Sequence, residues 1–173
     1  GSRSVEGDRL RERQRQLPKQ FSNMSVLSTL GIRPGGGCHY LAEGYAAMAR
    51  QLVPLVNQYN YGVEPKTSIT PPNIRSVSYL GDRKDAIKLV FDQDVKWDEE
   101  IIERFYLNDD SAKVTAVDGS GKTITLKLAG PTTAKNLSYV RGGKWRQDQS
   151  IIWGTNDLAS LTFCEVRIEL PVD

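Results

Sequence analysis

The spacing of apolar residues changes near Pro65, and this change divides the chain into two parts that fold differently. Before Pro65, apolar residues recur every three or four positions, which is typical of amphipathic helices. Beyond residue 72 they alternate with polar residues, which is typical of half-buried strands. We therefore expect an α+β chain with a helical part over residues 1–64, a linker over 65–72 and a β-rich domain over 73–173.

Two helices are predicted in the first part. Residues 8–16 form a highly charged segment that ends before Pro18, and residues 40–59 form a longer helix with an apolar stripe. The stripe contains Leu41, Tyr45, Met48, Ala49, Leu52, Val53, Val56 and Tyr59. Pro54 is expected to kink or loosen the last third of this helix, because proline removes a backbone donor. Leaving large apolar side chains exposed to water costs free energy. We therefore expect the stripe to pack on the rest of the chain or on a second molecule.

The segment between these helices has the order of an α/β unit. Residues 24–28 are short and β-like, and residues 31–37 form a glycine-rich loop that leads into the second helix. A single unit of this kind cannot cover both faces of its own strand.

Seven short strands are predicted after the linker, separated by Gly, Asp, Asn and Pro. They cover residues 74–80, 86–91, 105–108, 113–117, 123–128, 137–140 and 162–170. The clearest hairpin turns through Asp118-Gly119-Ser120-Gly121, and residues 98–103 are interpreted as one short helical turn. Because no helix here is long enough to connect parallel strands, we expect an antiparallel β-sandwich.

Charge and composition exclude several classes of function. The 173 residues include 23 Lys and Arg against 21 Asp and Glu, and six of the basic residues lie within the first 20 positions. The rest of the chain lacks the basic, aromatic-studded surface of nucleic-acid binders, so no nucleic-acid partner is expected. No apolar run approaches the roughly 18 residues of a bilayer span, so no membrane partner is expected.

Gly1-Ser2 resembles a cloning remnant, and the residues after it are expected to belong to a longer protein.

Metal chemistry is also not expected. Cys38 and Cys164 lie far apart without a C-x-x-C pair, and His39 is the one histidine of the sequence. A structural zinc site is therefore excluded, and neither a metal nor a cofactor is predicted. The two cysteines are interpreted as buried thiols, with a disulfide as the alternative.

The segment with catalytic potential is Gly35-Gly36-Gly37-Cys38-His39-Tyr40. Its imidazole lies where a glycine-rich loop enters a long amphipathic helix. A histidine in such a loop can present a ring nitrogen to a cleft, whereas one on the apolar face of a helix belongs to the core. His39 is therefore the candidate catalytic residue, and a structural histidine is the alternative.

The residues around His39 resemble the final block of the SGNH (GDSL-like) hydrolases. The likeness rests on residues 27–31, 37–40, 43–45 and 52–55, and it is most similar to the sialate O-acetylesterase-like carbohydrate esterases. In the second half, residues 136–140, 152–156 and 161–163 resemble the β-rich region that some of these esterases append.

The resemblance implies that residues 1–64 are the helical remnant of a flavodoxin-like α/β hydrolase domain. In that superfamily an N-terminal Gly-Asp-Ser block carries the nucleophile, and a histidine just before the last helix is the base, which matches His39. No Gly-Asp-Ser block occurs in this sequence. We therefore expect a C-terminal fragment of a carbohydrate ester hydrolase that is inert by itself, because a base without a nucleophile performs no acyl transfer. The implied partners are the missing N-terminal catalytic domain and an acetylated carbohydrate. The compartment is left open, and export of the parent protein to the periplasm or the cell exterior is compatible with these residues.

One position departs from the pattern of this superfamily. An aspartate usually stands three residues before the histidine and orients its ring, and here that position is Gly36. Three alternatives are open: an acidic group from elsewhere, a backbone carbonyl, or a Ser-His dyad without an orienting acid.

Substrate contacts are predicted in the β-rich part. Trp97 and Trp145 can stack on a pyranose ring, and Arg141 lies in the same polar loop as Trp145. Trp153 follows two isoleucines and is interpreted as a core residue. The alternative function is a non-catalytic β-sandwich module for carbohydrate binding or structural packing, with the helices as remnants of its neighbour.

Overall fold

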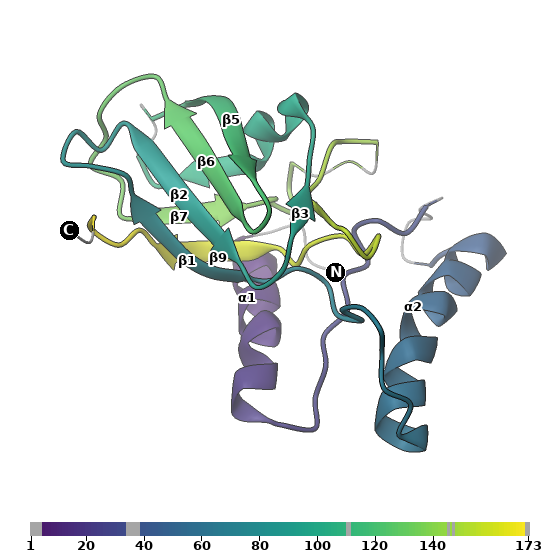
Figure 1. Cartoon of the computed structure of the whole chain (residues 1–173). Helices are drawn as coiled ribbons and strands as arrows, with labels where there is room; N and C mark the ends of the chain where they lie inside the picture. The colour runs from purple at the N-terminus through teal and green to yellow at the C-terminus, as the bar shows by residue number, and fades with distance from the viewer. Residues whose placement is uncertain (1–4, 34–38, 110–111, 145, 147, 172–173) are drawn as a thin grey trace.

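The computed structural model describes residues 5–33, 39–109, 112–144, 146 and 148–171 (Figure 1). Two helices precede a β-rich body. The helices are α1 (Val5–Gln20), α2 (Ala42–Tyr61) and the 3-10 helix η1 (Glu99–Arg104). The strands are β1 (Ile74–Tyr79), β2 (Ala86–Phe91), β3 (Val95–Lys96), β4 (Phe105–Leu107), β5 (Val114–Ser120), β6 (Thr123–Leu128), β7 (Asn136–Tyr139), β8 (Trp153–Gly154) and β9 (Phe163–Arg167).

The described strands form antiparallel sheets, as the alternating pattern predicts. The first sheet has the order β1-β2-β6-β5, the second has the order β4-β7-β9, and β3 pairs with β8. At one edge the two larger sheets are joined, because the backbone N–H of Tyr79 donates to the carbonyl of Glu169, whose own N–H donates to Val77. The chain is therefore α+β with antiparallel sheets.

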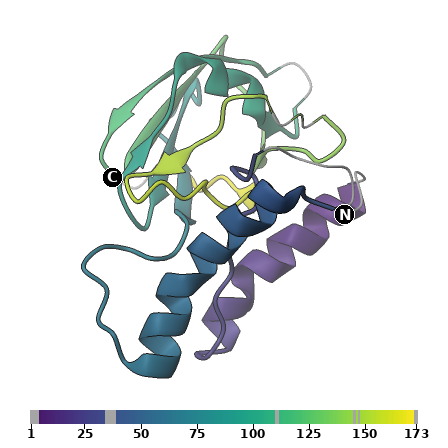
Figure 2. The same cartoon turned by 90° about the vertical axis from the view of Figure 1, so that its right-hand side faces the viewer.

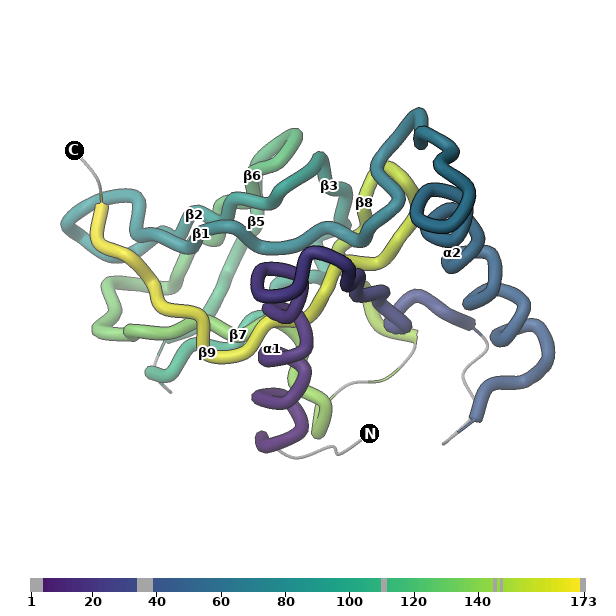
Figure 3. The backbone as a smooth tube through the Cα atoms, turned by 90° about the horizontal axis from the view of Figure 1, so that it is seen from below, coloured from purple at the N-terminus to yellow at the C-terminus, as the bar shows by residue number. Residues whose placement is uncertain are grey.

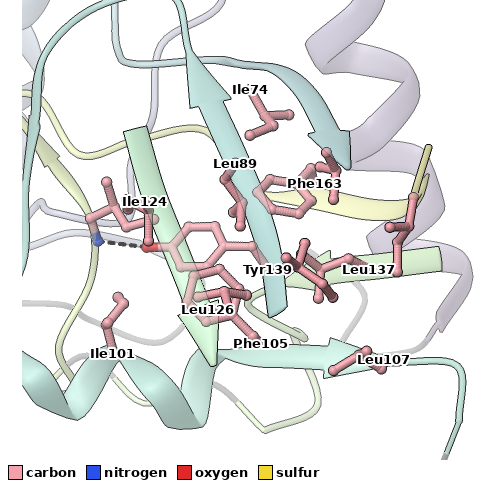
Figure 4. Close-up of a cluster of buried hydrophobic side chains, with 14 of the residues drawn as sticks. Ile74, Leu89, Ile101, Phe105, Leu107, Ile124, Leu126, Leu137, Tyr139 and Phe163 are labelled. Atoms are coloured by element: carbon pink, nitrogen blue, oxygen red, sulfur yellow. Dashed lines mark hydrogen bonds between the residues drawn. The ribbon is translucent and has the colours of Figure 1, made fainter. Parts of the chain in front are cut away.

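The hydrophobic core lies between the two larger sheets. Burial alternates from residue to residue along β2. Ile87, Leu89 and Phe91 are buried, and the residues between them are partly exposed. Tyr139 of β7 stands at the centre, with its ring 5.5 Å from that of Phe105 and 5.6 Å from that of Phe163 (Figure 4).

The phenol of Tyr139 is part of the same core. Its oxygen accepts a hydrogen bond from the backbone N–H of Ile152 at 2.7 Å. Complete burial raises the pKa of Tyr139, so the phenol stays neutral. The hydrogen bond thus satisfies a buried polar group and fixes the segment before β8 to the core.

Four local features of the structure bear on these expectations. Residues 24–28 form no strand, because a strand needs a neighbouring ladder and no described segment pairs with them. The first helix continues through Pro18 to Gln20, since a proline in the last turn disturbs little helix beyond it. The second helix runs through Pro54 as one element. Strands β3 and β8 have two residues each, too few to show alternation in the sequence.

Helix α1 is attached to strand β9 by polar groups (Figure 3). Arg15 is buried and binds the carboxylate of Glu12, the side chain of Asn73 and the carbonyl of Ile74. Glu12 also accepts a hydrogen bond from the backbone N–H of Cys164 at 3.1 Å. The charged segment is therefore partly buried against the β-rich body.

Helix α2 lies at one end of the molecule, beyond the strands and apart from β9 (Figures 2 and 3). It buries Gly44 and Leu55, whereas most of its predicted apolar stripe is exposed. It ends at Gly62, whose φ of 67° is left-handed and whose N–H donates to the carbonyl of Gln58. The stripe thus does not pack on the rest of the described chain. None of the described helices combines the length and apolar character that crossing a membrane requires.

Candidate functional site

His39 lies on the surface, three residues before the first residue of α2. Its Nδ1 atom is 3.4 Å from the phenol oxygen of Tyr45, which lies one helical turn into α2. The ring is exposed, so a group from another polypeptide or a substrate can reach it. The position fits the loop histidine predicted from the sequence, and its catalytic role stays a prediction.

The backbone around His39 is held by the two tyrosines that follow it. The rings of Tyr40 and Tyr45 meet edge to face with centroids 5.8 Å apart. The hydroxyl of Tyr40 donates to the carbonyl of Thr29 at 3.4 Å. A Cβ atom at Gly44 would lie 2.8 Å from that of Tyr40, so glycine is needed for Tyr40 to fold over the first turn. These contacts fix where the loop enters α2.

The nucleophile predicted to work with His39 is not found among the described residues. No described serine, threonine or cysteine side chain forms a hydrogen bond with its ring, and Tyr45 provides the polar contact instead. Gly36, which occupies the position of the orienting aspartate, lies outside the described residues, as does Cys38. The described chain can therefore supply a proton acceptor, but it does not place an attacking oxygen beside it.

A pocket of about 340 Å³ lies where the segment before His39 meets the β-rich body. It is lined by Gly31, Arg33, Asp98, Asp148, Gln149, Ser150, Ile151 and Trp153. A guanidinium nitrogen of Arg33 donates to the carbonyl of Gln149 at 3.4 Å. The pocket thus brings a cation from the N-terminal part together with two carboxylates and an aromatic ring from the β-rich part.

Gly31 permits the close approach that shapes this pocket. A Cβ atom there would lie 2.3 Å from Cη2 of the Trp153 ring and 3.1 Å from Cβ of Ala159. The sequence predicted Trp153 to be a core residue. In the structure its side chain is half-buried, and it also lines the pocket. The sequence offered no signal for Arg33, Asp98 or Asp148, because they meet through tertiary contacts.

The predicted carbohydrate-binding residues lie elsewhere on the β-rich part. Trp97 is half-buried and packs against the hydrophobic core. Arg141 places its guanidinium carbon 4.9 Å from the centre of the Tyr106 ring, and the ammonium of Lys144 lies 5.3 Å from the same centre. Trp145 lies outside the described residues. The structure therefore brings Arg141 and Lys144 together on Tyr106, and it does not bring Trp97 to them.

A metal site would need several ligating side chains close together in the part of the chain that the structure describes. Within it, no three His, Cys, Asp or Glu side chains are arranged to hold a metal ion. Cys164 is a free, half-buried thiol, and burial together with the nearby Glu165 raises its pKa.

Comparison with known proteins adds information about the fold. No protein-family model matches the chain, and no curated protein matches it. Among solved structures, a carbohydrate acetylesterase from Xanthomonas citri matches with a TM-score of 0.57 and 12% sequence identity. The match covers 77% of this chain and 30% of the esterase, so this chain corresponds to under a third of that protein. An S-layer protein, rSbsC(31-844), matches over 95% of this chain and 21% of its own length at 15% identity, but its TM-score of 0.39 supports no argument. The chain thus shares its fold with one part of a carbohydrate acetylesterase.

Proposed function

We propose that this chain is the C-terminal part of a carbohydrate ester hydrolase. In this proposal His39 is the general base, and an α/β domain that precedes these residues supplies the serine nucleophile. The observation that carries the proposal is the exposed imidazole at the entrance to α2, with Nδ1 directed at Tyr45. The resemblance around His39 to the final block of the SGNH hydrolases and the fold shared with a carbohydrate acetylesterase support it.

The proposed reaction moves one proton through His39 in each half. Nε2 accepts the proton of the serine hydroxyl as the serine oxygen bonds to the acetyl carbonyl carbon. The protonated ring then gives this proton to the sugar oxygen as the ester C–O bond breaks, which leaves a free sugar hydroxyl and an acetyl-serine. In the second half the ring accepts a proton from water as the water oxygen bonds to the acetyl carbon of the acetyl-serine, and the proton returns to the serine oxygen as acetic acid leaves, which then ionises to acetate in water.

Tyr45 supports this assignment of the basic nitrogen. If Nδ1–H donates to the phenol oxygen, the lone pair of the ring lies on Nε2, which is the nitrogen left free. This contact is a candidate for the orienting role that an aspartate at the position of Gly36 would fill. A neutral acceptor at 3.4 Å stabilises an imidazolium less than a carboxylate does, so Tyr45 is a positioning residue and not a charge partner.

The β-rich part is proposed to be an accessory module that contacts the catalytic part. The pocket supports this role, because Arg33 from the N-terminal part and residues 148–151 from the β-rich part line it together. The alternative, a module that binds carbohydrate through Trp97, Trp145 and Arg141, gains less support. Trp97 packs against the core and Arg141 already stacks on Tyr106.

The proposal is tested by measuring acetate release. The protein encoded by the complete reading frame and the 173-residue chain alone are each incubated with 4-nitrophenyl acetate and with a panel of acetylated oligosaccharides. We expect hydrolysis by the complete protein and none above the buffer rate by the chain alone. A complete reading frame without a serine-bearing α/β domain, or a complete protein that releases no acetate from any of these esters, would overturn the proposal.

A further inference from the structure

Tyr106 of β4 holds two positive charges on the outer face of its sheet. Its neighbours Phe105 and Leu107 belong to the hydrophobic core, so Tyr106 points away from the core by alternation. The guanidinium carbon of Arg141 lies 4.9 Å and the ammonium nitrogen of Lys144 5.3 Å from the centre of its ring. Neither cation forms an ion pair with a carboxylate of the described residues. The two like charges repel each other, and a bound anion relieves this repulsion.

The chain reaches Arg141 through a strained residue. Val140 is 5% exposed and has a φ of 58°, a left-handed conformation that is rare for a β-branched residue. Tyr106 pairs with Ser138, so their side chains share one face of the sheet. In a regular strand Arg141 would point to the opposite face, because side chains alternate. The turn at Val140 instead brings Arg141 over the Tyr106 ring, and strain of this kind is concentrated at binding and catalytic sites.

Helix α1 fixes the loop that carries both cations. The carboxylate of Asp8 accepts a hydrogen bond from the backbone N–H of Gly142 at 2.9 Å. The backbone N–H of Lys144 donates to the carbonyl of Arg141, also at 2.9 Å. The loop is thus a turn tied to a helix, and its two cations are placed before a ligand arrives.

The nearby arginines of α1 are already paired. Arg9 donates two hydrogen bonds to the carboxylate of Glu165, and Arg11 forms an ion pair with Asp8. A nucleic acid is bound by a row of cations along its phosphate backbone and by aromatic rings that stack on bases. Here the α1 arginines are neutralised and the Tyr106 ring already binds two cations. The surface therefore favours a ligand with separate anionic groups over a nucleic acid.

The two cations differ in what they can bind. Stacking on Tyr106 uses the flat face of the Arg141 guanidinium and leaves the N–H groups at its edge available. Two parallel N–H groups match the two oxygens of a carboxylate. Lys144 is exposed and adds a point charge beside them. A sugar is thus recognised here by its charge, whereas the sequence predicted recognition by stacking on tryptophan.

We infer that Tyr106, Arg141 and Lys144 form a binding site for the carboxylate groups of an acidic polysaccharide. The identity of the ligand as a carbohydrate rests on the proposed function, whereas the requirement for a carboxylate rests on the two cations. The site needs no contact with His39. It lets the β-rich part hold a uronic-acid-containing chain while esters of the same chain are hydrolysed elsewhere, which raises their effective concentration.

NMR titration of the 173-residue chain in low salt tests this inference. The probes are oligosaccharides of galacturonic, glucuronic and mannuronic acid, and the methyl ester of the first is the matched uncharged sugar. We expect amide shifts at residues 105–107 and 138–144 with at least one acidic oligosaccharide and none with the methyl ester. Arg141→Gln should weaken binding by about tenfold or more, and Lys144→Gln by about threefold. The control is Lys127→Gln on the other sheet, which removes the same charge and should change binding by less than about twofold.

Each other outcome contradicts the inference. Shifts with none of the acidic oligosaccharides, or equal shifts with the methyl ester, would exclude a carboxylate site. Equal losses in all three variants would assign binding to the overall charge of the chain. Equally tight binding of inorganic phosphate, polyglutamate or a DNA duplex would remove the carbohydrate from the account.

The site and the proposed function can fail separately. If the complete protein releases no acetate but the oligosaccharides bind at Arg141, the proposed function fails and the acidic site stands. If acetate is released and no acidic oligosaccharide binds, the site alone is wrong.

Discussion

The phenol oxygen of Tyr45 lies 3.4 Å from Nδ1 of His39, and both residues lie at the N-terminal end of helix α2. The imidazole is thus held by the same helix whose apolar stripe faces outward. Tyr45 thus belongs both to the exposed stripe of α2 and to the surroundings of the imidazole.

Replacing Tyr45 by phenylalanine keeps the ring and removes the oxygen. A neutral hydrogen bond of this kind contributes about 0.5–1.5 kcal/mol, so we expect kcat of the complete protein to fall by about 2- to 10-fold with KM unchanged. Steady-state kinetics across pH check this, because loss of a positioning contact also shifts the acidic limb of the kcat profile. An unchanged kcat and pH profile would assign Tyr45 to packing alone.

Gly31 is predicted to control the contact between the N-terminal loop and the β-rich body. Gly31→Ala would place a methyl group 2.3 Å from the Trp153 ring, which costs about 1–3 kcal/mol of unfolding free energy. Gly130→Ala is the control, because no atom lies within 4 Å of the added methyl group. Urea unfolding followed by tryptophan fluorescence measures both variants. Equal stability of the two would mean that the loop does not pack on Trp153.

Arg15 is predicted to be essential for the attachment of α1. It is 3% exposed and binds Glu12, Asn73 and Ile74, so Arg15→Ala removes the cation that pairs with the Glu12 carboxylate and the donor to Asn73 and Ile74. We expect a loss of about 3 kcal/mol of unfolding free energy, since breaking a buried ion pair by removing one partner is strongly destabilising. The exposed Arg13 is the control, and Arg13→Ala should have little effect. Matching losses for the two variants in urea unfolding would contradict this role.

The ion pair between Arg9 and Glu165 is predicted to weaken in acid. The hydrogen bonds from Arg9 lower the pKa of Glu165 below its ordinary value of 4.5. Because the folded pKa is the lower one, the pair contributes stability above the ordinary value, and this contribution is lost as pH falls through the folded pKa. Both side chains are largely exposed, so the effect is small and screened by salt.

The comparison of wild type with Arg9→Ala at several pH values checks this dependence. The difference in unfolding free energy should be present near pH 6 in low salt and should shrink as the pH is lowered below 4.5. A difference that grows as the pH falls would contradict the assignment.

The β-rich part could be predicted from the sequence because its pattern is local. In β2 and β6 every second residue is apolar and buried, and the turn through Gly119 and Gly121 uses positive φ angles that suit glycine. Strands β3 and β8 lack this signal, since two residues show no period.

Tertiary contacts explain what the sequence could not show. The sequence shows helix α1 only as a highly charged segment, yet Asp8 and Arg15 are buried, and Asp8 accepts a hydrogen bond from the backbone N–H of Gly142. The apolar stripe of α2 was visible in the sequence, but a periodic pattern does not say whether its partner belongs to the same chain. The contact between His39 and Tyr45 was also hidden, because Tyr45 fits the stripe equally well.

The most direct test of the central claim is the rate at which a fluorophosphonate probe labels the serine of the complete protein. This reaction needs a base for the serine hydroxyl but no carbohydrate, so it isolates the role assigned to His39. We predict that His39→Asn slows labelling by about 10³-fold or more while the protein stays folded, as judged by its unfolding midpoint. Labelling of the folded variant at a rate within tenfold of the wild type would contradict the account.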